Sequence, residues 1–562
     1  MTVLAIAATL VGAGLAGVRW LRVAQREHYL PGSVTRFAAR WWRAGPNLLL
    51  GLAVVLGIVL AQQAPLTAVA GSAALAAGPF GLSLRGRTSA LAWTRRLRTL
   101  TGVWVALHLL LVGVGVLAGV GPPVAALAAT LTPLLIDAAL AITAPLERRR
   151  VGPFVASAAT RLAQVSPTVL AITGSYGKTT IKGYVAHLVA GSRSVVPTPA
   201  SFNNRAGLAR AVNEHLAPGT EVFVAEMGTY GKGEIADLCR WCPPEVAVIS
   251  AIGPVHLERM GTEEAIVAAK AEILEGARVA ILNVDHPLLA RLAGQREAAG
   301  QRVVRCSAAG AGGATASAGH AADENTAGIA TASDDDPLNQ TLPAGRATVS
   351  AGHAPDATTP AGGPPAAAGT PIAEVRVADG VVLVDRRRLG TVPKAAGAAP
   401  TNVACAVAAA LEVGVPEEAV AARLATLPTA PHRLSVSQGQ TGATIIDDTY
   451  NANPAGAAVA LAALDRHASS EHRRVVVTPG MVELGPVQEA ENRRLAAAAA
   501  RAATHLVVVG HTNRAALVAG AAGGRAELVL TETRDEAVAW VRQHVGQGDV
   551  VLYENDLPDH FP

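Results

Sequence analysis

The residues with the clearest chemistry lie in one glycine-rich segment, Gly174-Ser-Tyr-Gly-Lys-Thr-Thr180, which follows the apolar run 168–173. Backbone N–H groups in such a turn, together with the positive end of a helix that begins there, form a cradle for phosphate groups. Lys178 adds a point charge for the β- and γ-phosphates, and the hydroxyl of Thr179 is placed to ligate Mg²⁺. A strand, this loop and a helix in succession predict a nucleotide triphosphate site rather than a tight turn without a ligand.

Three titratable side chains follow this loop at the ends or faces of apolar elements. Glu226 ends one apolar strand, where a second contact to Mg²⁺ is needed, and His256 ends the next one. Lys270 lies on the mostly apolar face of a predicted helix, where a lysine is anomalous unless it is paired or modified. We expect these side chains to extend the phosphate site, although a lone glutamate at a strand end is also common on a protein surface.

The elements that must position these residues change in character at residue 151. From there, β-branched runs alternate with alanine-rich stretches, which is typical of a wound α/β sheet. Residues 307–371 consist almost entirely of Ala, Gly, Thr, Ser, Pro and Asp. Such a segment buries too little apolar surface to offset its ordering entropy, so we predict a disordered insertion. The histidines in and before it, His286, His320 and His353, are predicted to be solvated rather than metal-bound.

The first 150 residues predict a membrane region. Fourteen arginines, no lysine and three acids give this segment a charge of +11, so the rest of the +4 chain carries −7. Basic residues confined to an apolar segment argue against nucleic acid and for a lipid bilayer as partner. Since a span needs about 20 residues, the longer apolar stretches split, and five spans are predicted. These lie at about 2–18, 46–62, 65–84, 101–120 and 123–144.

The arginines also predict the orientation of these spans. The loops 19–43 and 85–98 and the triplet Arg148–Arg150 are rich in arginine, and such loops stay on the cytoplasmic side. We therefore expect a multi-pass protein of the plasma membrane, with its amino terminus outside and residues after 150 in the cytoplasm. A cleaved signal peptide is the alternative for the first run, but its arginines follow the apolar stretch instead of preceding it. Asp137, in the middle of a span, is either a functional carboxylate or a packing residue.

The four cysteines are too few and too scattered for a disulfide scaffold, so a reducing compartment is expected. Cys239 and Cys242 form a lone CxxC pair. A structural zinc site needs about four protein ligands, and the other two cysteines are distant in the sequence. We therefore interpret the pair as ordinary helix cysteines, with a metal site and a redox motif as alternatives.

Ten motifs, in order, resemble those of the Mur ligases, and within that family the MurF-like branch. They are GSYGKTT (174–180), SFNNRAGL (201–208), AEMG (225–228), GEIADL (233–238), PVHLE (254–258), AAKAEIL (268–274), ILNVDHP (281–287), TNVACAVAAAL (401–411), HRL (432–434) and DDTYNANPAG (447–456). After the α-helical membrane region that the composition predicts over 1–150, the resemblance implies two α/β domains. These are a P-loop-containing central ATP-binding domain over 151–430, which holds the insertion at about 307–371, and a Rossmann-like C-terminal domain over 431–562.

The resemblance also implies roles for individual residues. Lys178 would hold the ATP phosphates, Thr179 and Glu226 would ligate Mg²⁺, and His256 would help to bind a second Mg²⁺. Lys270 matches a lysine that becomes carbamylated by CO₂ and then bridges to the metal. The residues expected around the nucleotide are Gly174, Ser175, Gly177, Lys178, Thr179, Thr180, Asn283, Asp285, Asn402, Arg433 and Asp448. Asn203 and Asn204 would hold the carboxylate substrate, and Asn451 and Asn453 the incoming amine.

The implied reaction is ATP-dependent amide formation in peptidoglycan or cell-envelope synthesis: ATP phosphorylates a carboxylate, and an amino acid or dipeptide amine attacks the acyl phosphate. Three departures bear on the acceptor. The membrane region replaces the UDP-sugar-binding domain of the family, Arg205 stands in place of a glutamate, and Tyr553–Pro558 replaces a basic ending. The acidic acceptor is therefore a UDP-muramoyl-peptide, a lipid-linked carboxylate or a polymeric one.

Two other functions remain as alternatives. One is a poly-γ-glutamate or other polymer amide synthase, for which a membrane anchor near an export route makes sense. The other is a catalytically silent membrane scaffold. The presence of every lysine, threonine, glutamate and histidine named for the phosphate and metal sites argues against the scaffold, because a degenerate site is expected to lose some of them.

Overall fold

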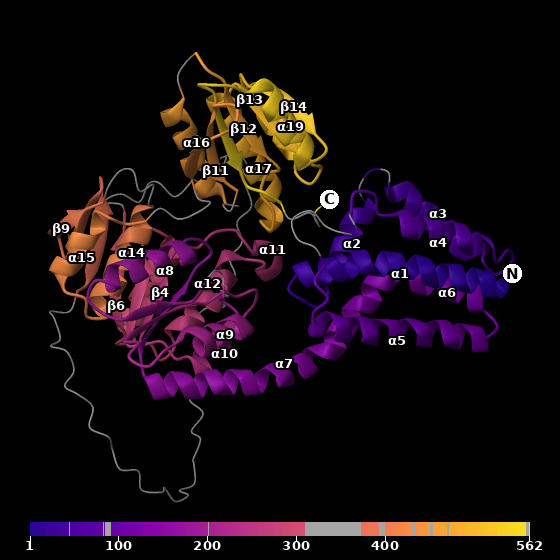
Figure 1. Cartoon of the computed structure of the whole chain (residues 1–562), viewed down its shortest axis with the longest axis horizontal. Helices are drawn as coiled ribbons and strands as arrows, with labels where there is room; N and C mark the ends of the chain where they lie inside the picture. Colours follow the sequence, from indigo (N-terminus) through magenta and orange to yellow (C-terminus); the bar gives the residue numbers. More distant parts are fainter. Residues whose placement is uncertain are drawn as a thin grey trace, which may run out of the picture.

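The computed structural model has three parts, a helical region and two α/β domains (Figure 1). It describes residues 1–43, 45, 47–82, 84, 91–199, 202–308, 372–392, 399–428, 434–449, 453–468, 471–557 and 561. Most of the predicted insertion, from residue 309 to 371, therefore lies outside the described residues. The long helix α7, Thr132–Val165, runs from the helical region along the central domain and packs there against α9.

Among the described residues the helical region contains seven helices, which overlap all five predicted spans but do not all match a span in length. They are α1 (Thr2–Arg26), α2 (Ser33–Arg43), α3 (Asn47–Leu60), α4 (Thr67–Ala77), α5 (Arg95–Leu117), α6 (Gly121–Thr130) and α7. By length and composition, only α1 and α5 among the described helices could each cross a membrane alone. The pairs α2–α3 and α6–α7 are bent by 106° and 70°, and counting each pair as one span gives up to four. Two to four spans, not five, are therefore supported.

The difference from five spans arises in the pair α3 and α4. With 14 and 11 residues, they extend about 21 and 17 Å at 1.5 Å per residue, which is less than the hydrocarbon core of about 30 Å. They pack closely on each other, since a Cβ added to Gly57 would lie 3.1 Å from the Cα of Gly71. The sequence shows an uncharged stretch of sufficient length, but not where the helices within it end.

Asp137 has a structural contact within this region. Its carboxylate accepts hydrogen bonds from the backbone N–H groups of Val34 and Thr35, at 3.3 and 2.7 Å, and from the Thr35 hydroxyl at 2.6 Å. These donors belong to the first turn of α2, where unsatisfied N–H groups favour a negative charge. Asp137 therefore caps and anchors α2, which agrees with the packing interpretation of this residue.

The central domain is built on a nine-stranded sheet in the order β2-β3-β1-β4-β5-β6-β7-β8-β9. Its strands are β1 (Thr168–Thr173), β2 (Val195–Pro197), β3 (Val222–Glu226), β4 (Val246–Ile249), β5 (Val279–Asn283), β6 (Arg302–Ser307), β7 (Glu374–Ala378), β8 (Val381–Val384) and β9 (Arg387–Thr391). The strands from β2 to β7 are parallel, and β8 and β9 are antiparallel additions. Because parallel strands end at the same edge, residues that follow β1, β3, β4 and β5 meet there.

Helices cover both faces of this sheet, which explains why the inner strands are apolar along their whole length. The central helices and short helical turns are α8 (Lys178–Val189), α9 (Arg205–His215), α10 (Glu234–Trp241), α11 (Leu257–Met260), α12 (Glu263–Ala271), η1 (Glu272–Leu274), α13 (Pro287–Ala298), α14 (Pro400–Glu412) and α15 (Glu417–Leu424). Leu170 and Ile172 of β1 pack on the face covered by α8 and α14, whereas Val169 and Ala171 face α9, α10 and the end of α7.

The C-terminal domain has a six-stranded sheet in the order β10-β11-β15-β12-β13-β14, in which only β10 is antiparallel to its neighbour. Its elements are β10 (Ser435–Gln438), β11 (Thr444–Asp448), α16 (Pro454–His467), β12 (Arg474–Thr478), η3 (Gly485–Val487), α17 (Gln488–Ala502), β13 (His505–Val509), α18 (Arg514–Ala521), β14 (Glu527–Thr531), α19 (Arg534–His544) and β15 (Val550–Glu554). Helices α16, α17 and α18 cover one face and α19 covers the other. The α/β nature predicted for both domains is confirmed.

Candidate active site

The glycine-rich loop joins β1 to α8, as the sequence predicts. Gly174 and Gly177 have φ values of +151° and +81°, and a Cβ on Gly174 would lie 1.9 Å from the hydroxyl oxygen of Ser250. Only glycine fits this turn without displacing its neighbours. Lys178 is the first residue of α8, and its ammonium donates a hydrogen bond to the Gly174 carbonyl at 2.7 Å. The lysine therefore folds back over the loop at the positive end of the helix.

Glu226 is the centre of a buried polar cluster beside the loop. The Thr179 hydroxyl donates to its Oε2 at 3.0 Å, and Asn203 donates an amide N–H to its Oε1 at 3.1 Å. Lys182 forms an ion pair with the same Oε2 at 2.9 Å. Glu226 and Lys182 are almost completely buried, so the lysine charge offsets the cost of burying the carboxylate. Thr179 and Glu226, predicted to share a metal, are therefore in direct contact.

Lys270 carries a buried amine close to the phosphate loop. It lies in the last turn of α12 with 1% of its surface exposed, and within the described part of the chain no carboxylate forms an ion pair with it. Burial, aided by the nearby charge of Lys178, lowers the pKa of Lys270 to about 7. At neutral pH a large share of this amine is therefore uncharged and nucleophilic.

His256 lies close enough to the two lysines to sense their charge. Burial lowers its pKa, the charges of Lys270 and Lys178 act in the same direction, and a hydrogen bond with Glu483 opposes them. The bond joins His256 Nδ1 to Glu483 Oε2 at 2.9 Å and crosses from the central to the C-terminal domain. With Nδ1 occupied, Nε2 is the ring nitrogen that remains for a ligand.

The residues expected around the nucleotide fall into three groups. Asn283 and Asp285 follow β5, where the Asn283 side chain accepts from the Asp285 N–H at 3.1 Å. Asn402 of α14 reaches the loop, because a Cβ on Gly177 would lie 2.5 Å from its Oδ1. Asp448, at the end of β11 in the other domain, accepts from the Leu434 N–H at 3.1 Å. Arg433 lies outside the described residues.

Ser175 and Thr180 complete the loop. The Ser175 N–H donates to the Ala251 carbonyl at 2.7 Å, which ties the loop to the residues after β4. Thr180 is buried in the first turn of α8. These contacts give both residues a part in the shape of the loop.

Three of the four asparagines expected at the substrates are described, and among these three Asn203 alone has a hydrogen bond to Glu226. Asn204 is the N-cap of α9 and accepts from the Gly207 N–H at 3.0 Å. Asn453 is likewise the N-cap of α16 and accepts from the Gly456 N–H at 2.8 Å. Both side-chain oxygens are therefore committed to helix starts. Asn451 lies outside the described residues.

The remaining candidates have structural partners. Arg205 forms an ion pair with Asp237 of α10. The Cys239 sulfur lies 3.9 Å from the Met227 sulfur, and burial raises the pKa of the Cys239 thiol to about 12. No group of three or more His, Cys, Asp or Glu side chains that could hold a metal ion is present in the described ranges.

Sequence reasoning missed Lys182 and Glu483. Lys182 follows Lys178 by four residues and so shares its helix face, and a second lysine on that otherwise buried face could have been noticed. Glu483 gave no local signal, because its partner His256 is 227 residues away in the sequence. It adopts a φ of +64° in the loop between β12 and η3.

The fold and this loop define the class of the protein: an α/β enzyme with a P-loop nucleotide site and a second α/β domain in contact with it. The Mur ligase middle domain family matches residues 172–343, and the Mur ligase glutamate ligase domain family matches residues 432–553. The chain belongs to the Mur ligase family, whose members are ATP-dependent acid–amino-acid ligases.

Among its relatives is the UDP-N-acetylmuramoyl-tripeptide–D-alanyl-D-alanine ligase of Mycobacterium tuberculosis, 32% identical over 470 residues that cover 78% of this chain and 80% of the relative. The enzyme of the same name from Mycobacterium leprae is 31% identical and covers 68% and 70%. A crystal structure of MurF from Acinetobacter baumannii shares the fold, with a TM-score of 0.51 and 23% identity over 72% of this chain and 77% of that one.

Proposed function

We propose that this chain is a MurF-like ligase of peptidoglycan synthesis, which joins D-alanyl-D-alanine to the carboxylate of a UDP-muramoyl-tripeptide. The mycobacterial relatives that carry this name support the pair of substrates. The observation that carries the chemistry is the hydrogen bond between Thr179 and Glu226, because it joins the phosphate loop to a carboxylate at the edge of the sheet.

The first step makes a leaving group from the acceptor carboxylate. One carboxylate oxygen attacks the γ-phosphorus of ATP, the bond to the bridging oxygen breaks, and ADP leaves. Both reactants are anions, so Lys178 and the N–H groups of the loop neutralise the charge that gathers between them. Asn203 lies beside this position through its bond to Glu226, where its amide can orient the acceptor.

The site has the donors that Mg²⁺ prefers. A hydroxyl and a carboxylate are hard oxygen ligands, and Mg²⁺ at nucleotide sites takes only one or two protein carboxylates besides phosphate oxygens and water. Thr179 and Glu226 would hold one such ion, and His256 and Lys270 would help to hold a second. When bound, the ions reduce the repulsion between acceptor and nucleotide.

We propose further that Lys270 is carbamylated. The neutral amine attacks CO₂, and one proton leaves to form an anionic carbamate. Two observations support this: the amine is buried with no carboxylate paired to it among the described residues, and its pKa is about 7. A carbamate would place an anion where the amine stands, and its oxygens could serve as ligands for Mg²⁺.

In the second step the amine attacks the acyl carbon, inorganic phosphate leaves with the oxygen that came from the acceptor, and the amine loses a proton. No enzyme nucleophile is required, so no covalent intermediate forms on the chain. The C-terminal domain would bring the amine to the acyl phosphate, since Glu483 already links this domain to His256.

We also propose that residues 1–150 anchor the ligase at the cytoplasmic face of the plasma membrane. The amino terminus lies at the end of the helical region farthest from the ligase domains (Figure 1), and Arg26, at the other end of α1, lies on the ligase side. Because arginine-rich ends of spans stay on the cytoplasmic side, this orientation of α1 supports ligase domains in the cytoplasm. Recovery of the full chain in the soluble fraction of cells, without membranes, would contradict the anchor.

The test of the reaction uses the full chain in detergent. With ATP and Mg²⁺, phosphate release should require both UDP-muramoyl-tripeptide and D-alanyl-D-alanine, and the product should be the corresponding pentapeptide by mass. Release that depends on glutamate and a polyglutamate acceptor instead would favour a polymer synthase. Release that is indifferent to every acceptor and amine would refute the ligase reaction proposed here.

A further inference from the structure

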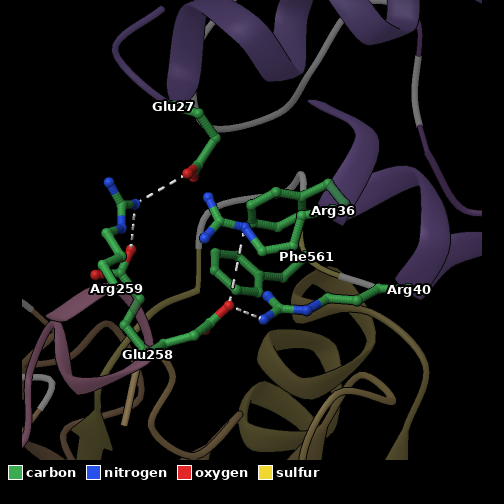
Figure 2. Close-up of a pocket in the computed structure, with 8 residues that line it drawn as sticks. Glu27, Arg36, Arg40, Glu258, Arg259 and Phe561 are labelled. Carbon is green, nitrogen blue, oxygen red and sulfur yellow. Dashed lines mark hydrogen bonds and ion pairs between the residues drawn. The ribbon is translucent and has the colours of Figure 1, made fainter. Parts of the chain in front are cut away.

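Arg259 of the central domain links the end of the first helix to both ligase domains. Glu27, which follows α1, accepts a hydrogen bond from Nη2 of Arg259 at 2.9 Å, as Figure 2 shows. The same Nη2 donates to Glu483 of the C-terminal domain at 3.1 Å. Only 10% of the Arg259 side chain and 4% of the Glu27 side chain are exposed. One desolvated guanidinium therefore joins all three parts of the chain.

The amphipathic helix α2 forms a second contact with the same domains. Arg40 and Arg36 form ion pairs with Glu258 of α11, the latter at 4.0 Å (Figure 2). On the same helix, Phe37 packs edge-on against Phe561 near the C-terminus, with ring centroids 4.9 Å apart. Polar and apolar contacts thus hold α2 against both ligase domains.

These contacts lead directly to His256. Glu483, one partner of Arg259, is hydrogen-bonded to His256 Nδ1. A second route runs through rings: His28 stacks on Tyr230 with centroids 5.0 Å apart, and Tyr230 lies edge-on to His256 at 5.3 Å. The side chain expected near the second Mg²⁺ is therefore separated from the helical region by two residues on the first route and by one on the second.

The backbone at three residues along these routes is strained. His28, His256 and Glu483 have φ values of +55°, +72° and +64°. A left-handed conformation is unfavourable for a non-glycine residue and persists only where surrounding contacts hold it. Their occurrence together indicates that the three parts of the chain hold one another in this geometry.

We propose that Glu27 is a positioning residue of the ligase site. Through Arg259 and Glu483 it orients His256 and keeps the two ligase domains together. The proposal rests on the proposed function, in which His256 would help to hold a second Mg²⁺. Glu27 and Glu483 are the carboxylates that the structure shows paired with Arg259. Without Glu27, the guanidinium can turn away from Glu483. His256 then loses the fixed orientation that its hydrogen bond to Glu483 provides. The helical region would thereby contribute to turnover as well as to anchoring.

The first test compares Glu27→Gln with Arg43→Gln in the full chain. Arg43 is an exposed arginine on α2, so it is a matched control for loss of a charge in this region. We expect Glu27→Gln to lower kcat about tenfold or more, while KM for ATP changes less than about twofold because the phosphate loop is untouched. Arg43→Gln should leave both constants within about twofold.

The second test measures the domain arrangement directly. Spin labels at Arg210→Cys on α9 and Glu527→Cys on β14, both exposed sites, report the distance between the two ligase domains in a Cys239→Ser background. We expect one narrow distance distribution in the parent and a broader one in Glu27→Gln and in Arg259→Gln. The double variant Glu27→Gln/Glu483→Gln should lose no more activity than Glu483→Gln alone, since both act on the same contact.

Parental kcat and a parental distance distribution in Glu27→Gln would overturn the proposal. So would a fall in kcat equal to that of Arg43→Gln, or losses that add in the double variant. If the parent itself forms no amide with the proposed substrates, the proposed function fails, whereas the distance measurement still decides whether Glu27 holds the domains together.

Discussion

The neutral amine of Lys270 leads to a quantitative prediction. CO₂ reacts only with an uncharged amine, and the pKa of Lys270 is about 7 instead of 10.5. At pH 8 roughly nine-tenths of such an amine is neutral, against about 0.3% of an ordinary lysine, which is about a 300-fold difference. We therefore expect Lys270 to form a carbamate at the CO₂ levels of air-equilibrated buffer, where exposed lysines do not.

The perturbation is removal of CO₂. In degassed buffer at pH 8 the rate of amide formation should fall, and added bicarbonate should restore it. Chain equilibrated with ¹³C-labelled CO₂ should show one carbamate carbon resonance. Below pH 7 the amine gains its proton, so the resonance should weaken and more bicarbonate should be required. Lys270→Ala should lack the resonance and regain part of its activity from short carboxylates that replace the anion.

Lys232 provides the control, because it is an exposed lysine outside the site. Lys232→Ala should keep both the resonance and the response to bicarbonate. The reasoning is refuted if CO₂ removal leaves the rate unchanged and the ¹³C spectrum of the parent matches that of Lys270→Ala. In that case burial alone would account for the lowered pKa, with no modification.

Three further predictions concern single residues. Lys178→Ala should abolish phosphate release while the thermal midpoint stays close to that of the parent; an active variant would remove the phosphate-site assignment. Asn204→Ala should destabilise the chain by about 1 kcal/mol through loss of the α9 cap, measured by thermal denaturation, and a loss of turnover at unchanged stability would instead assign this side chain to the substrate. Burial beside Asp448 raises the pKa of Glu554 well above 4.5, so folding takes up a proton and stability falls as the pH rises above about 4.5. Glu554→Gln should therefore raise the thermal midpoint more at pH 8 than at pH 5; an equal effect at both would show that Glu554 does not titrate.

The sequence predicts best where chemistry and local structure coincide. The residues of the loop 174–180 are adjacent in the sequence, and its glycines, lysine and threonines together are typical of one kind of turn between a strand and a helix. The position of the loop between β1 and α8 therefore follows from the sequence. Glu226 is predicted for a related reason, because the carboxyl ends of parallel strands meet at one edge. Burial of Lys270 is indicated by the apolar face on which it lies.

Other features depend on information that is not local. In a sequence, an asparagine before a helix can be either a cap or a substrate ligand. Only the structure shows that the side-chain oxygens of Asn204 and Asn453 cap helices. Inside an uncharged stretch, no charged residue marks where a helix ends. The sequence therefore predicts longer helices than α3 and α4. The contact of Glu27 with Arg259 joins residues 232 positions apart, and nothing near either residue in the sequence indicates it.

The central claim is that the terminal phosphate of ATP, held by the loop from Gly174 to Thr180, is transferred to a carboxylate oxygen of the acceptor. An acceptor labelled with ¹⁸O in that carboxylate tests this most directly. We predict that the released inorganic phosphate carries one ¹⁸O from the acceptor for each amide bond formed. Phosphate without the label, alongside normal amide formation, would contradict an acyl phosphate and with it the mechanism proposed for this site.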